Sequence, residues 1–412
     1  MKYAVIGSAL YGNKGASAML ETLVQGLEAL DDDAQFVLFS LYPSQDVERN
    51  DFENLSIVPA SPLALVLAII PLCLVHRYIK PLRPWLAGRS LAVRELSQSH
   101  VYVDQCGISF NDGRLTFLVY NIAVLLPGLL MRLPIVKVAQ ALGPFKSRIN
   151  RLAAKLILPR LHHIFARGEI TFSHLQSLGL TNISEGTDLA LAFSPTRNAE
   201  SPWTAALPQL DNADRELVGI APSAVAARKA AAANIDYVDA MARLIDSISE
   251  RGYWPILFPH SARPDSEREH NNDLPLCRAI HAALARPDTC QLIDQELTTS
   301  ELRDLIGTCT CVVTSRFHAM VGALAVEVPC LVVGWSHKYE EVLSPFGLED
   351  QALDYRNCEQ HQLTARFDHT VSHSAEIRGK LSRALPRMRS LAFQQISLVH
   401  ETATIMAPKQ HR

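Results

Sequence analysis

A short cluster of hydroxyl and basic side chains follows an apolar run in the C-terminal half, at 315–319 (SRFHA). Arginine presents a planar fork that suits a carboxylate or a phosphate, and histidine can donate to an anion and move a proton near neutral pH. We expect Ser315 to cap the helix that follows, so that free amide groups, Arg316 and His318 converge on one anion. The alternative is an ordinary helix start with an exposed arginine and a histidine at the edge of the core.

A second cluster follows one strand later, at 334–341 (GWSHKYEE). It repeats the order of apolar run, polar loop and helix start. We expect Ser336 to cap this helix, and we expect His337 and Lys338 to bring positive charge to a second anion site beside the first. A solvated helix start is the alternative.

Two candidate groups end other apolar runs. His260 follows the run at 256–258 and is a candidate acid or base, with a structural histidine as the alternative. Near the N-terminus, the loop at 12–19 (GNKGASAM) combines glycines with a helix start. Glycines allow a close approach of the backbone, so Asn13 and Gly15 are candidates for binding an anion or a sugar. A plain strand-to-helix turn is the alternative there.

The segment 104–112 (DQCGISFND) is rich in hydrogen-bonding side chains and follows another apolar run. Such a loop suits a polyol acceptor, because each hydroxyl needs a donor or an acceptor. Asp104 and Asp112 are therefore candidates for binding the acceptor, and either could act as a base towards a hydroxyl. Aspartates that cap a turn or a helix are the alternative.

Alternating strands and helices must position these loops. The strands expected at 3–6, 36–39, 101–104, 135–139 and 164–166 form a first series, and those at 218–221, 256–258, 312–314 and 330–333 form a second. This order predicts an α/β protein with two Rossmann-like, doubly wound domains that face a cleft. The predicted domains are an acceptor-side domain at 1–195 and a donor domain at 215–365, with a proline-containing linker at 194–214. A helical segment at 366–412 follows, and Pro386 is expected to break or kink its helix.

Composition excludes several classes of protein. The chain has 412 residues, 48% of them hydrophobic, and a net charge of −3, which indicates a globular protein with no overall attraction to nucleic acid. The eight cysteines have no metal-ligand spacing, so we expect reduced thiols in a cytosolic protein and no metal site. The start of the chain, MKYAVIG, enters an apolar strand without the pattern of a signal peptide.

Two apolar segments leave the relation to membranes open. The segment 55–75 has no charged residue but contains three prolines, and the segment 122–136 is interrupted only by Arg132. Basic residues follow both. Buried helices are one interpretation, and a surface that rests on the inner face of the cell membrane, apolar side down with a basic rim, is the other.

The two C-terminal clusters resemble the signature of the polysaccharide pyruvyl transferase family, in which Ser-Arg-x-His-Ala is followed by Gly-x-Ser-x-Lys. The segments 13–16 (NKGA) and 140–145 (QALGPF) are similar to the family's Asn-x-Gly loop and Gln-x-x-Gly-Pro segment, and Pro259-His260 falls at its Pro-His. The segment 104–112 is similar to its glycine-rich acceptor-side loop, with CGI in place of a run of glycines. The resemblance spans most of the chain.

The resemblance implies a fold like that of GT-B glycosyltransferases, phosphoenolpyruvate as co-substrate with no other cofactor, and a sugar or lipid-linked glycan as acceptor. Arg316 and Lys338 would hold the carboxylate and the phosphate, together with Ser315, Ser336 and His337. His318 would donate to the phosphate or protonate the enol carbon. The base towards the acceptor would be Asp104, Asp112 or His260. The product would be a pyruvate ketal on a cell-surface polysaccharide or its precursor.

Two other functions remain open at this stage. A GT-B glycosyltransferase that uses a nucleotide sugar would share the architecture and the basic loops. A relative without catalytic activity that binds glycan would share the fold but would release no phosphate from phosphoenolpyruvate. The sequence leaves the acceptor sugar, the position and stereochemistry of the ketal, and the oligomeric state undefined.

Overall fold

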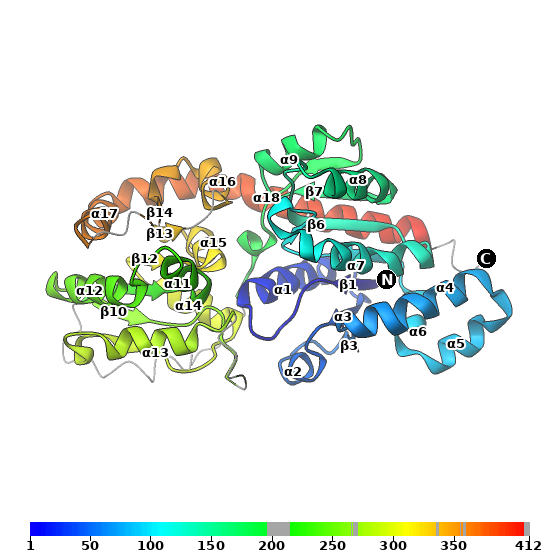
Figure 1. The fold of residues 1–412 in the computed structure, drawn as a ribbon, viewed down its shortest axis with the longest axis horizontal. Coiled ribbons are helices and arrows are strands. Elements are labelled where there is room, and N and C mark those ends of the chain that lie inside the picture. Colours follow the sequence, from blue (N-terminus) through cyan, green and yellow to red (C-terminus); the bar gives the residue numbers. More distant parts are fainter. Residues whose placement is uncertain are drawn as a thin grey trace. The chain divides into compact units, whose positions relative to one another are not determined.

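The computed structural model describes residues 1–195, 215–264, 266, 271–334, 338–354, 356 and 360–407 (Figure 1). The chain forms two compact units. Unit 1 comprises Met1–Tyr11, Ala16–Leu189 and Arg389–Arg412, and unit 2 comprises Gly12–Gly15 and Ala190–Met388. Each unit is a parallel β-sheet with helices packed around it, so the predicted α/β class with two Rossmann-like domains is confirmed.

The sheet of unit 1 has the order β3-β2-β1-β4-β6-β7-β8, and β5 pairs with β6 beside this path. Its central strands β1, β4 and β6 are largely buried apolar runs, as expected where helices cover both faces of a parallel sheet. Their bounds are β1 (Lys2–Ile6), β2 (Gln35–Ser40), β3 (Leu55–Pro59), β4 (Val101–Asp104), β5 (Ile108–Ser109), β6 (Ile135–Leu142), β7 (His163–Ala166) and β8 (Ile183–Glu185).

The helices of unit 1 connect these strands and build most of its outer surface (Figure 1). The helix α7 is apolar along its whole length and packs on α4, β4 and β6. The helical elements are α1 (Lys14–Glu28), α2 (Pro43–Glu48), α3 (Pro62–Ala64), η1 (Leu65–Ile69), α4 (Ile70–Tyr78), η2 (Lys80–Leu82), α5 (Arg83–Arg89), α6 (Leu91–Gln98), η3 (Asp112–Phe117), α7 (Leu118–Met131), α8 (Arg148–Ile157), η4 (Leu158–Arg160), α9 (Glu169–Gln176) and η5 (Leu189–Ala192).

The sheet of unit 2 has the order β11-β10-β9-β12-β13-β14, which is the strand order of a Rossmann fold. Its strands are parallel, and β9 and β12 lie at its centre. Their bounds are β9 (Leu217–Ala221), β10 (Trp254–Leu257), β11 (Gln291–Leu292), β12 (Cys311–Thr314), β13 (Cys330–Gly334) and β14 (Ala352–Asp354).

Some helices of unit 2 begin at recognisable capping residues. Asp236 caps α12 by accepting from the amide of Asp239, and Thr298 and Glu301 form a reciprocal capping box at α14. The elements are α11 (Ala224–Ala231), α12 (Tyr237–Glu250), α13 (Leu274–Ala282), η6 (Pro287–Thr289), α14 (Thr299–Thr308), α15 (Phe317–Ala325), α16 (Lys338–Leu343), η7 (Ser344–Phe346), η8 (Glu349–Gln351), α17 (Gln360–Ser372) and α18 (Ser374–Met406).

The division of the chain differs from the predicted domains in two places. The loop Gly12–Gly15 belongs to unit 2 although it lies within the predicted domain 1–195. The helix α18 contains Pro386 inside one continuous helix, and its residues divide between the units at Met388. The segment 366–412 is therefore not a separate helical unit. Most of the predicted linker, 196–214, lies outside the described residues.

Within the part of the chain that the structure describes, none of the helices combines the length and the apolar composition that crossing a bilayer requires. The predicted apolar segment 55–75 forms β3, α3, η1 and part of α4. Of its side chains, Leu65, Ile69 and Cys73 point into the core, whereas Leu63 and Leu67 are about 70% exposed (72% and 71%). The segment is thus neither fully buried nor a single span.

Candidate functional site

The predicted C-terminal motifs gather at the carboxyl edge of the sheet in unit 2. Because its strands are parallel, the loops after β9, β10 and β12 leave the sheet at the same edge. His260 follows β10 by three residues, and Arg316 follows β12 by two. Ligands of doubly wound sheets bind beyond this edge. The sequence pattern therefore placed these candidate side chains correctly relative to the sheet.

Ser315 does not cap the helix after β12, and that prediction is wrong. The helix α15 begins at Phe317, and its N-cap is Arg316 in an extended conformation. The amide of Arg316 donates to Thr314 Oγ1 at 2.8 Å. The hydroxyl of Ser315 instead shares a buried 2.7 Å hydrogen bond with the Tyr237 hydroxyl, because α12 brings this tyrosine against the end of β12.

Arg316 forms a two-point ion pair with Asp273, the residue before α13. Nε of Arg316 donates to Oδ2 of Asp273 at 2.6 Å, and Nη2 donates to Oδ1. The carboxylate is fully buried and also accepts from the amides of Ala224 at 2.9 Å and Ser261 at 3.1 Å. Three loops after three strands are thus joined through one carboxylate, which fixes the plane of the guanidinium.

His318 lies in the first turn of α15, directly against the backbone of Gly15. A Cβ atom built on Gly15 would overlap the imidazole at Cγ and Nδ1, so only glycine fits at this position. The ring of Phe317 lies edge-on to the imidazole, with 5.0 Å between ring centroids. The backbone of Gly15 and the ring of Phe317 therefore both restrict where the His318 side chain can lie.

The loop Gly12–Gly15 is held in unit 2 by its own contacts. Asn13 forms an isolated antiparallel bridge with Ser261, and the amide of Ala262 donates to the carbonyl of Gly12 at 3.2 Å. The side chain of Lys14 forms a 2.7 Å ion pair with Glu296. Asn13 Oδ1 accepts from the Gly15 amide at 3.2 Å, which is the local turn that the sequence allowed.

These contacts change the grouping of the predicted residues. Asn13 and Gly15 were expected on the acceptor side, with the first domain. The structure instead places them in unit 2, beside the residues predicted to bind the donor. The reason is the bridge to Ser261, a long-range pairing that local spacing cannot reveal.

His260 is buried close to other basic side chains of this cluster. Burial first, and then the nearby charges of His318, Arg316 and Arg303, hold the pKa of His260 well below its usual value of 6.5. The imidazole is therefore neutral at neutral pH. Two arginines and a second histidine thus act on one buried ring at the end of this sheet, and side chains of these types can bind an anion.

Arg303 is part of this region and was not predicted. It lies in α14, is 5% exposed, and donates through Nη2 to the carbonyl of Ala190 at 3.0 Å. Its guanidinium also lies 5.3 Å from the centroid of the Phe193 ring. Neither Arg303 nor Asp273 stands in a motif directly after an apolar strand, so only the tertiary structure connects them to the site.

The structure describes only part of the second basic cluster. Ser336 and His337 lie outside the described residues. Lys338 is the first residue of α16, which confirms that a helix starts at this point after β13. The hydroxyl of Tyr339 donates to the carbonyl of Ser315 at 2.8 Å, so the beginnings of α15 and α16 are joined by a direct hydrogen bond.

Asp104 lies at the end of β4 in unit 1 and is 1% exposed. It forms an ion pair with the fully buried Lys137, and its Oδ1 accepts from the Cys106 amide at 2.9 Å. The carbonyl of Asp104 accepts from the Gln140 side chain at 2.7 Å. The carboxylate predicted to face an acceptor is thus neutralised inside the core.

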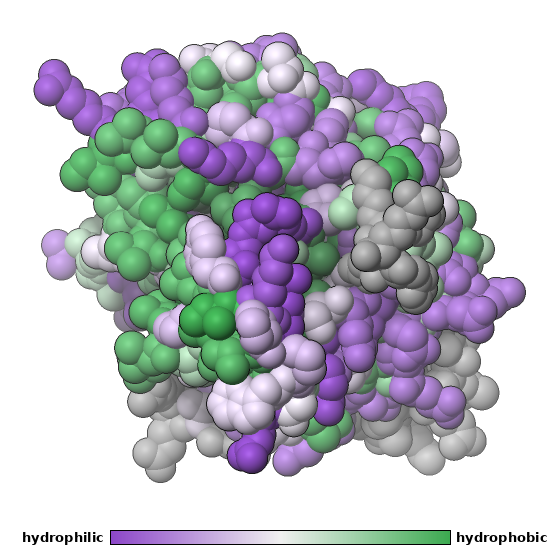
Figure 2. All heavy atoms as spheres, turned by 90° about the vertical axis from the view of Figure 1, so that its right-hand side faces the viewer, coloured by the Kyte–Doolittle hydropathy of each residue, from purple (hydrophilic) through white to green (hydrophobic). Residues whose placement is uncertain are grey.

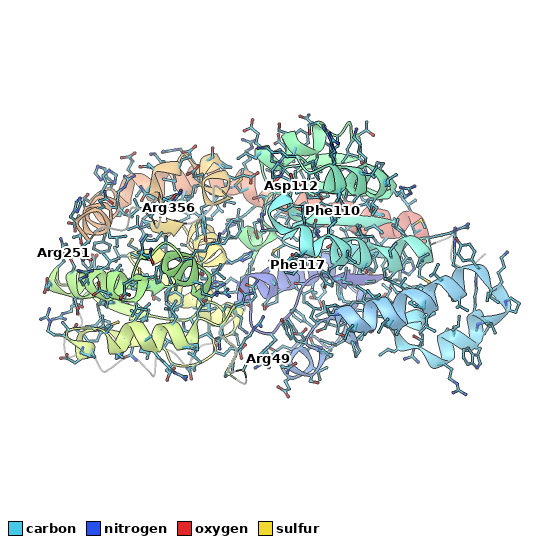
Figure 3. The ribbon with its side chains drawn as sticks, in the orientation of Figure 1. Arg49, Phe110, Asp112, Phe117, Arg251 and Arg356 are labelled. Atoms are coloured by element: carbon cyan, nitrogen blue, oxygen red, sulfur yellow. The ribbon has the colours of Figure 1, made fainter. Side chains whose placement is uncertain are left out.

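Asp112 holds the start of α8. Its Oδ2 accepts from the amides of Lys146 at 2.6 Å and Ser147 at 3.2 Å, and its Oδ1 accepts from Asn150 Nδ2 at 2.8 Å. Figure 3 shows Asp112 near Phe110 and Phe117 in the same part of unit 1. Both carboxylate oxygens are engaged, which matches the capping alternative rather than a base towards a hydroxyl.

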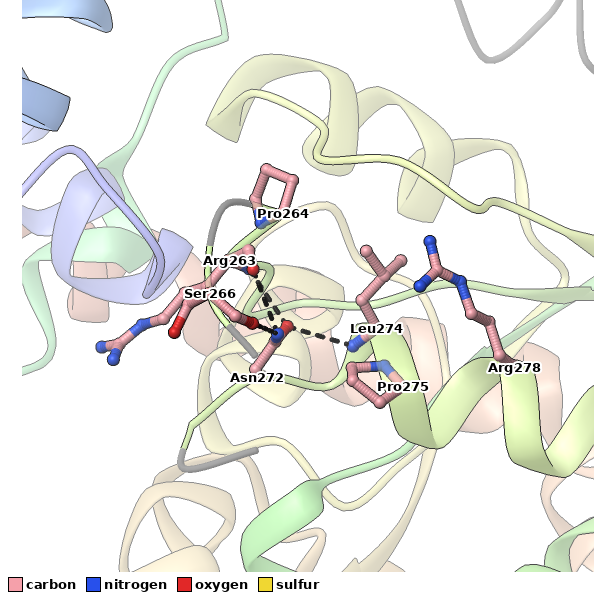
Figure 4. A pocket seen from close by; sticks show the side chains of 7 residues that line it. All are labelled: Arg263, Pro264, Ser266, Asn272, Leu274, Pro275 and Arg278. Atoms are coloured by element: carbon pink, nitrogen blue, oxygen red, sulfur yellow. Dashed lines mark hydrogen bonds between the residues drawn. The ribbon is translucent and has the colours of Figure 1, made fainter. Parts of the chain in front are cut away.

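A separate open cavity of about 430 Å³ lies at the entry to α13 (Figure 4). Arg263 and Arg278 contribute charge to it, and Asn272 crosses it by bonding to the backbone of Arg263 at 3.1 Å. Arg278 is paired with Asp294 at 2.6 Å. The bonds of Asn272 stabilise the loop that leads to Asp273, and Asp273 in turn orients Arg316. We therefore do not assign the donor site to this cavity.

The fold and the basic cluster together define a class. Two Rossmann-type units, with cationic groups at the carboxyl edge of the second sheet, make this a GT-B-like α/β protein. Among solved structures, it is similar to a putative UDP-N-acetylglucosamine 2-epimerase from Listeria monocytogenes, with a TM-score of 0.61 and 14% identity over 93% of this chain and 91% of the other. It is also similar to the UDP-GlcNAc 2-epimerase from Neisseria meningitidis, with a TM-score of 0.60 and 10% identity over 97% and 99%.

Sequence comparison identifies the family of this chain more specifically than these shared folds do. Residues 13–337 match the model of the polysaccharide pyruvyl transferase family, and the chain belongs to this family. The chain is also similar to the amylovoran biosynthesis protein AmsJ of Erwinia amylovora, with 21% identity over 95% of this chain and 97% of that protein. The matched region includes Asn13, His260, Arg316 and His318, the residues gathered in unit 2.

Proposed function

We propose that this protein transfers the enolpyruvyl carbons of phosphoenolpyruvate to a sugar of a cell-surface polysaccharide or its precursor, forming a pyruvate ketal and releasing phosphate. The observation that carries the proposal is the cluster of Arg316, His318 and His260 at the carboxyl edge of the second sheet, inside the region that matches the family. Phosphoenolpyruvate is small and carries two anionic groups, which suits such a site.

Arg316 is proposed to bind one anionic group of the donor. Its guanidinium is held in one plane by Asp273, so its remaining edge is oriented before any ligand arrives. A donor group that is already oriented binds an anion with little loss of conformational entropy. Lys338 is proposed to bind the other group, since it begins the neighbouring helix α16.

His318 is proposed to be the acid. It would transfer its proton to the methylene carbon of phosphoenolpyruvate, which leaves an oxocarbenium-like centre at the carbon that carries the phosphate. One sugar hydroxyl then adds to this carbon, the C–O bond to phosphate breaks, and a second hydroxyl closes the ketal. Of the two hydroxyl protons, one restores the acid and the other leaves with phosphate.

His260 is the candidate base that the structure favours over Asp104 and Asp112. Its imidazole is neutral, because burial and neighbouring cations lower its pKa, and a neutral imidazole can accept a proton. Asp104 is instead paired with Lys137, and Asp112 is bonded to the start of α8. The acceptor is proposed to be a sugar or lipid-linked glycan with two neighbouring hydroxyl groups.

The test is incubation with phosphoenolpyruvate and a panel of glycan intermediates, with phosphate release and the mass gain of the glycan as readouts. Arg316→Ala should lower the rate at limiting phosphoenolpyruvate by about 10²-fold or more, as expected for a lost oriented donor. Arg251→Ala is the matched control, because Arg251 pairs with Asp368 at the surface and is remote from the motifs in sequence.

Ligand binding separates the proposal from a nucleotide-sugar transferase. Stabilisation against heat by phosphoenolpyruvate, and not by UDP or GDP, supports the proposed donor. Stabilisation by a nucleotide alone would overturn it. Binding of glycan without phosphate release for any acceptor would indicate a relative without catalytic activity.

A further inference from the structure

Unit 1 carries an unusual concentration of exposed apolar side chains. Among the described residues, every large apolar side chain that is exposed belongs to unit 1, and none belongs to unit 2. Nine of them lie at 63–91 and six at 115–156. The most exposed are Tyr78 (75%) on α4, Val119 (73%) on α7, Leu63 (72%) and Leu67 (71%) before α4, and Ile149 (70%) on α8. Exposed apolar side chains clustered in this way indicate a binding surface.

The helices that carry these side chains are neighbours. The helix α4 packs along α7, η1 also contacts α7, and α8 contacts α7 from another side. Figure 2 shows apolar side chains gathered over a broad part of this face of the molecule, next to hydrophilic ones. We call the surface of η1, α4, α5, η3, α7 and α8 the apolar face of unit 1.

Apart from Asp112 at the start of η3, the charged side chains on the same segments are all basic. No aspartate or glutamate occurs between Asn54 and Arg94, and none occurs between Gly113 and Gly168, although the chain has 42 acidic residues. Exposed basic residues are frequent there. They are Lys80, Arg89, Arg94, Arg132, Lys146, Arg148, Arg151, Lys155 and Arg160. The apolar face is therefore bordered by positive charge within a protein whose net charge is −3.

The helix α8 shows the arrangement most clearly. Ile149, Leu152 and Leu156 are all more than half exposed and follow helical spacing, so they form one outward stripe. Arg148, Arg151 and Lys155 precede them by one residue each and form a parallel basic stripe. Asn150 and Ala154 face the core on the other side.

We propose that the apolar face of unit 1 binds the surface of a lipid bilayer that contains anionic headgroups. Apolar side chains would enter the boundary between headgroups and acyl chains, and the basic border would contact the headgroups. Tyr78 and Trp85 are 75% and 57% exposed, and amphipathic rings of this kind favour the headgroup level. The one acidic side chain of these segments, Asp112, is bonded to the start of α8, so little repulsion from anionic headgroups is expected. This inference does not depend on the proposed reaction.

The test is co-sedimentation of the full chain with vesicles, using phosphatidylcholine alone and phosphatidylcholine with phosphatidylglycerol. We expect binding to the anionic vesicles that weakens with salt. The triple variant Arg148→Gln, Arg151→Gln and Lys155→Gln should bind on the order of 100-fold more weakly, from about 5-fold for each charge near the surface. The control is Arg243→Gln, Arg278→Gln and Arg286→Gln, which removes equal charge from unit 2 and should bind like the wild type.

A second variant tests the apolar contribution. Ile149→Ser, Leu152→Ser and Leu156→Ser should lose most of the binding to anionic vesicles, whereas Leu30→Ser, Val47→Ser and Ile405→Ser, also exposed in unit 1, should retain it. Thermal unfolding of each variant shows whether it folds. No binding to either vesicle overturns the proposal, and so does equal binding by all variants. If the protein instead self-associates without binding vesicles, and the variant with Ile149→Ser, Leu152→Ser and Leu156→Ser does not, the apolar face is a protein interface.

Discussion

The imidazole of His318 occupies the space where any residue other than glycine at position 15 would place its Cβ atom. The first turn of α1 and the first turn of α15 therefore meet without an intervening side chain. Gly15 is close to the chain's start and His318 is far along it, yet both belong to unit 2. The position of the proposed acid is thus fixed by a backbone segment from the N-terminal loop.

Gly15→Ala should displace His318 and lower phosphoenolpyruvate-dependent phosphate release by about 10²-fold or more, as for loss of a positioned acid. Gly307→Ala is the matched control, because nothing lies within 4 Å of a Cβ atom there and Gly307 is in the helix α14. We expect this control to keep full activity and to gain up to about 1 kcal/mol of stability. Equal activity of both variants would contradict the proposed role of this contact.

Asp273→Ala should destabilise the protein strongly, because it leaves the guanidinium of Arg316 and the amides of Ala224 and Ser261 without their acceptor. We expect a loss of about 3–5 kcal/mol in the free energy of unfolding, typical of a broken buried pair. Asp368→Ala removes the partner of Arg251 from a solvent-exposed pair and should cost about 1 kcal/mol or less. Urea unfolding measures the free energy of unfolding of both variants. Similar losses would contradict the expectation that the buried pair stabilises the protein more than the exposed pair.

Acid should destabilise the folded protein through His260. Its pKa is lowered well below 6.5 in the folded state, so the unfolded chain binds more protons once the pH falls below about that value. The free energy of unfolding should then decrease by up to about 1.4 kcal/mol per pH unit from this group. His260→Asn should show a shallower decrease between about pH 6.5 and pH 5. The pKa values of the half-buried His76 and His163 are also lowered, but these residues contribute similarly to both proteins, so the difference between the two proteins isolates His260.

Tyr237→Phe and Ser315→Ala should each cost about 1 kcal/mol of stability, because each removes one partner of a buried hydrogen bond. The double variant should cost clearly less than the sum of the two single changes, since the same bond is lost. Additive losses would show that the two hydroxyl groups do not interact. A selective rise in KM for phosphoenolpyruvate in Ser315→Ala would return this hydroxyl to the donor site.

Local sequence patterns were sufficient to predict most of the fold. The strand Val101–Asp104 has the predicted bounds, and the strand Leu217–Ala221 begins one residue before its predicted start. Both are marked by their own buried apolar residues. The helix α18 continues through Pro386, where a break or kink was expected, because a proline inside a helix does not always end it.

The candidate site was harder to predict because its contacts join distant segments. Arg316 and His318 were visible as a motif, whereas Asp273 precedes them by more than forty residues and looks like an ordinary helix start before Leu274-Pro275. The hydroxyl of Ser315 was assigned to a cap by local preference, but Tyr237 offers it a buried partner. Asp104 was assigned to an acceptor, since no local pattern indicates that Lys137 in the adjacent strand neutralises it.

The division of α18 between the units has a consequence for synthesis of the chain. Gln395 is fully buried in unit 1, where it donates to the Thr187 carbonyl and accepts from the Ala139 amide, and His400 bonds to the Tyr3 hydroxyl. During translation, the ribosome therefore releases every segment of unit 2 before unit 1 receives its last helix. Domains usually fold in the order in which they emerge, but here Tyr3 in β1 and Ala139 in β6 bond to residues of α18 that are synthesised after unit 2.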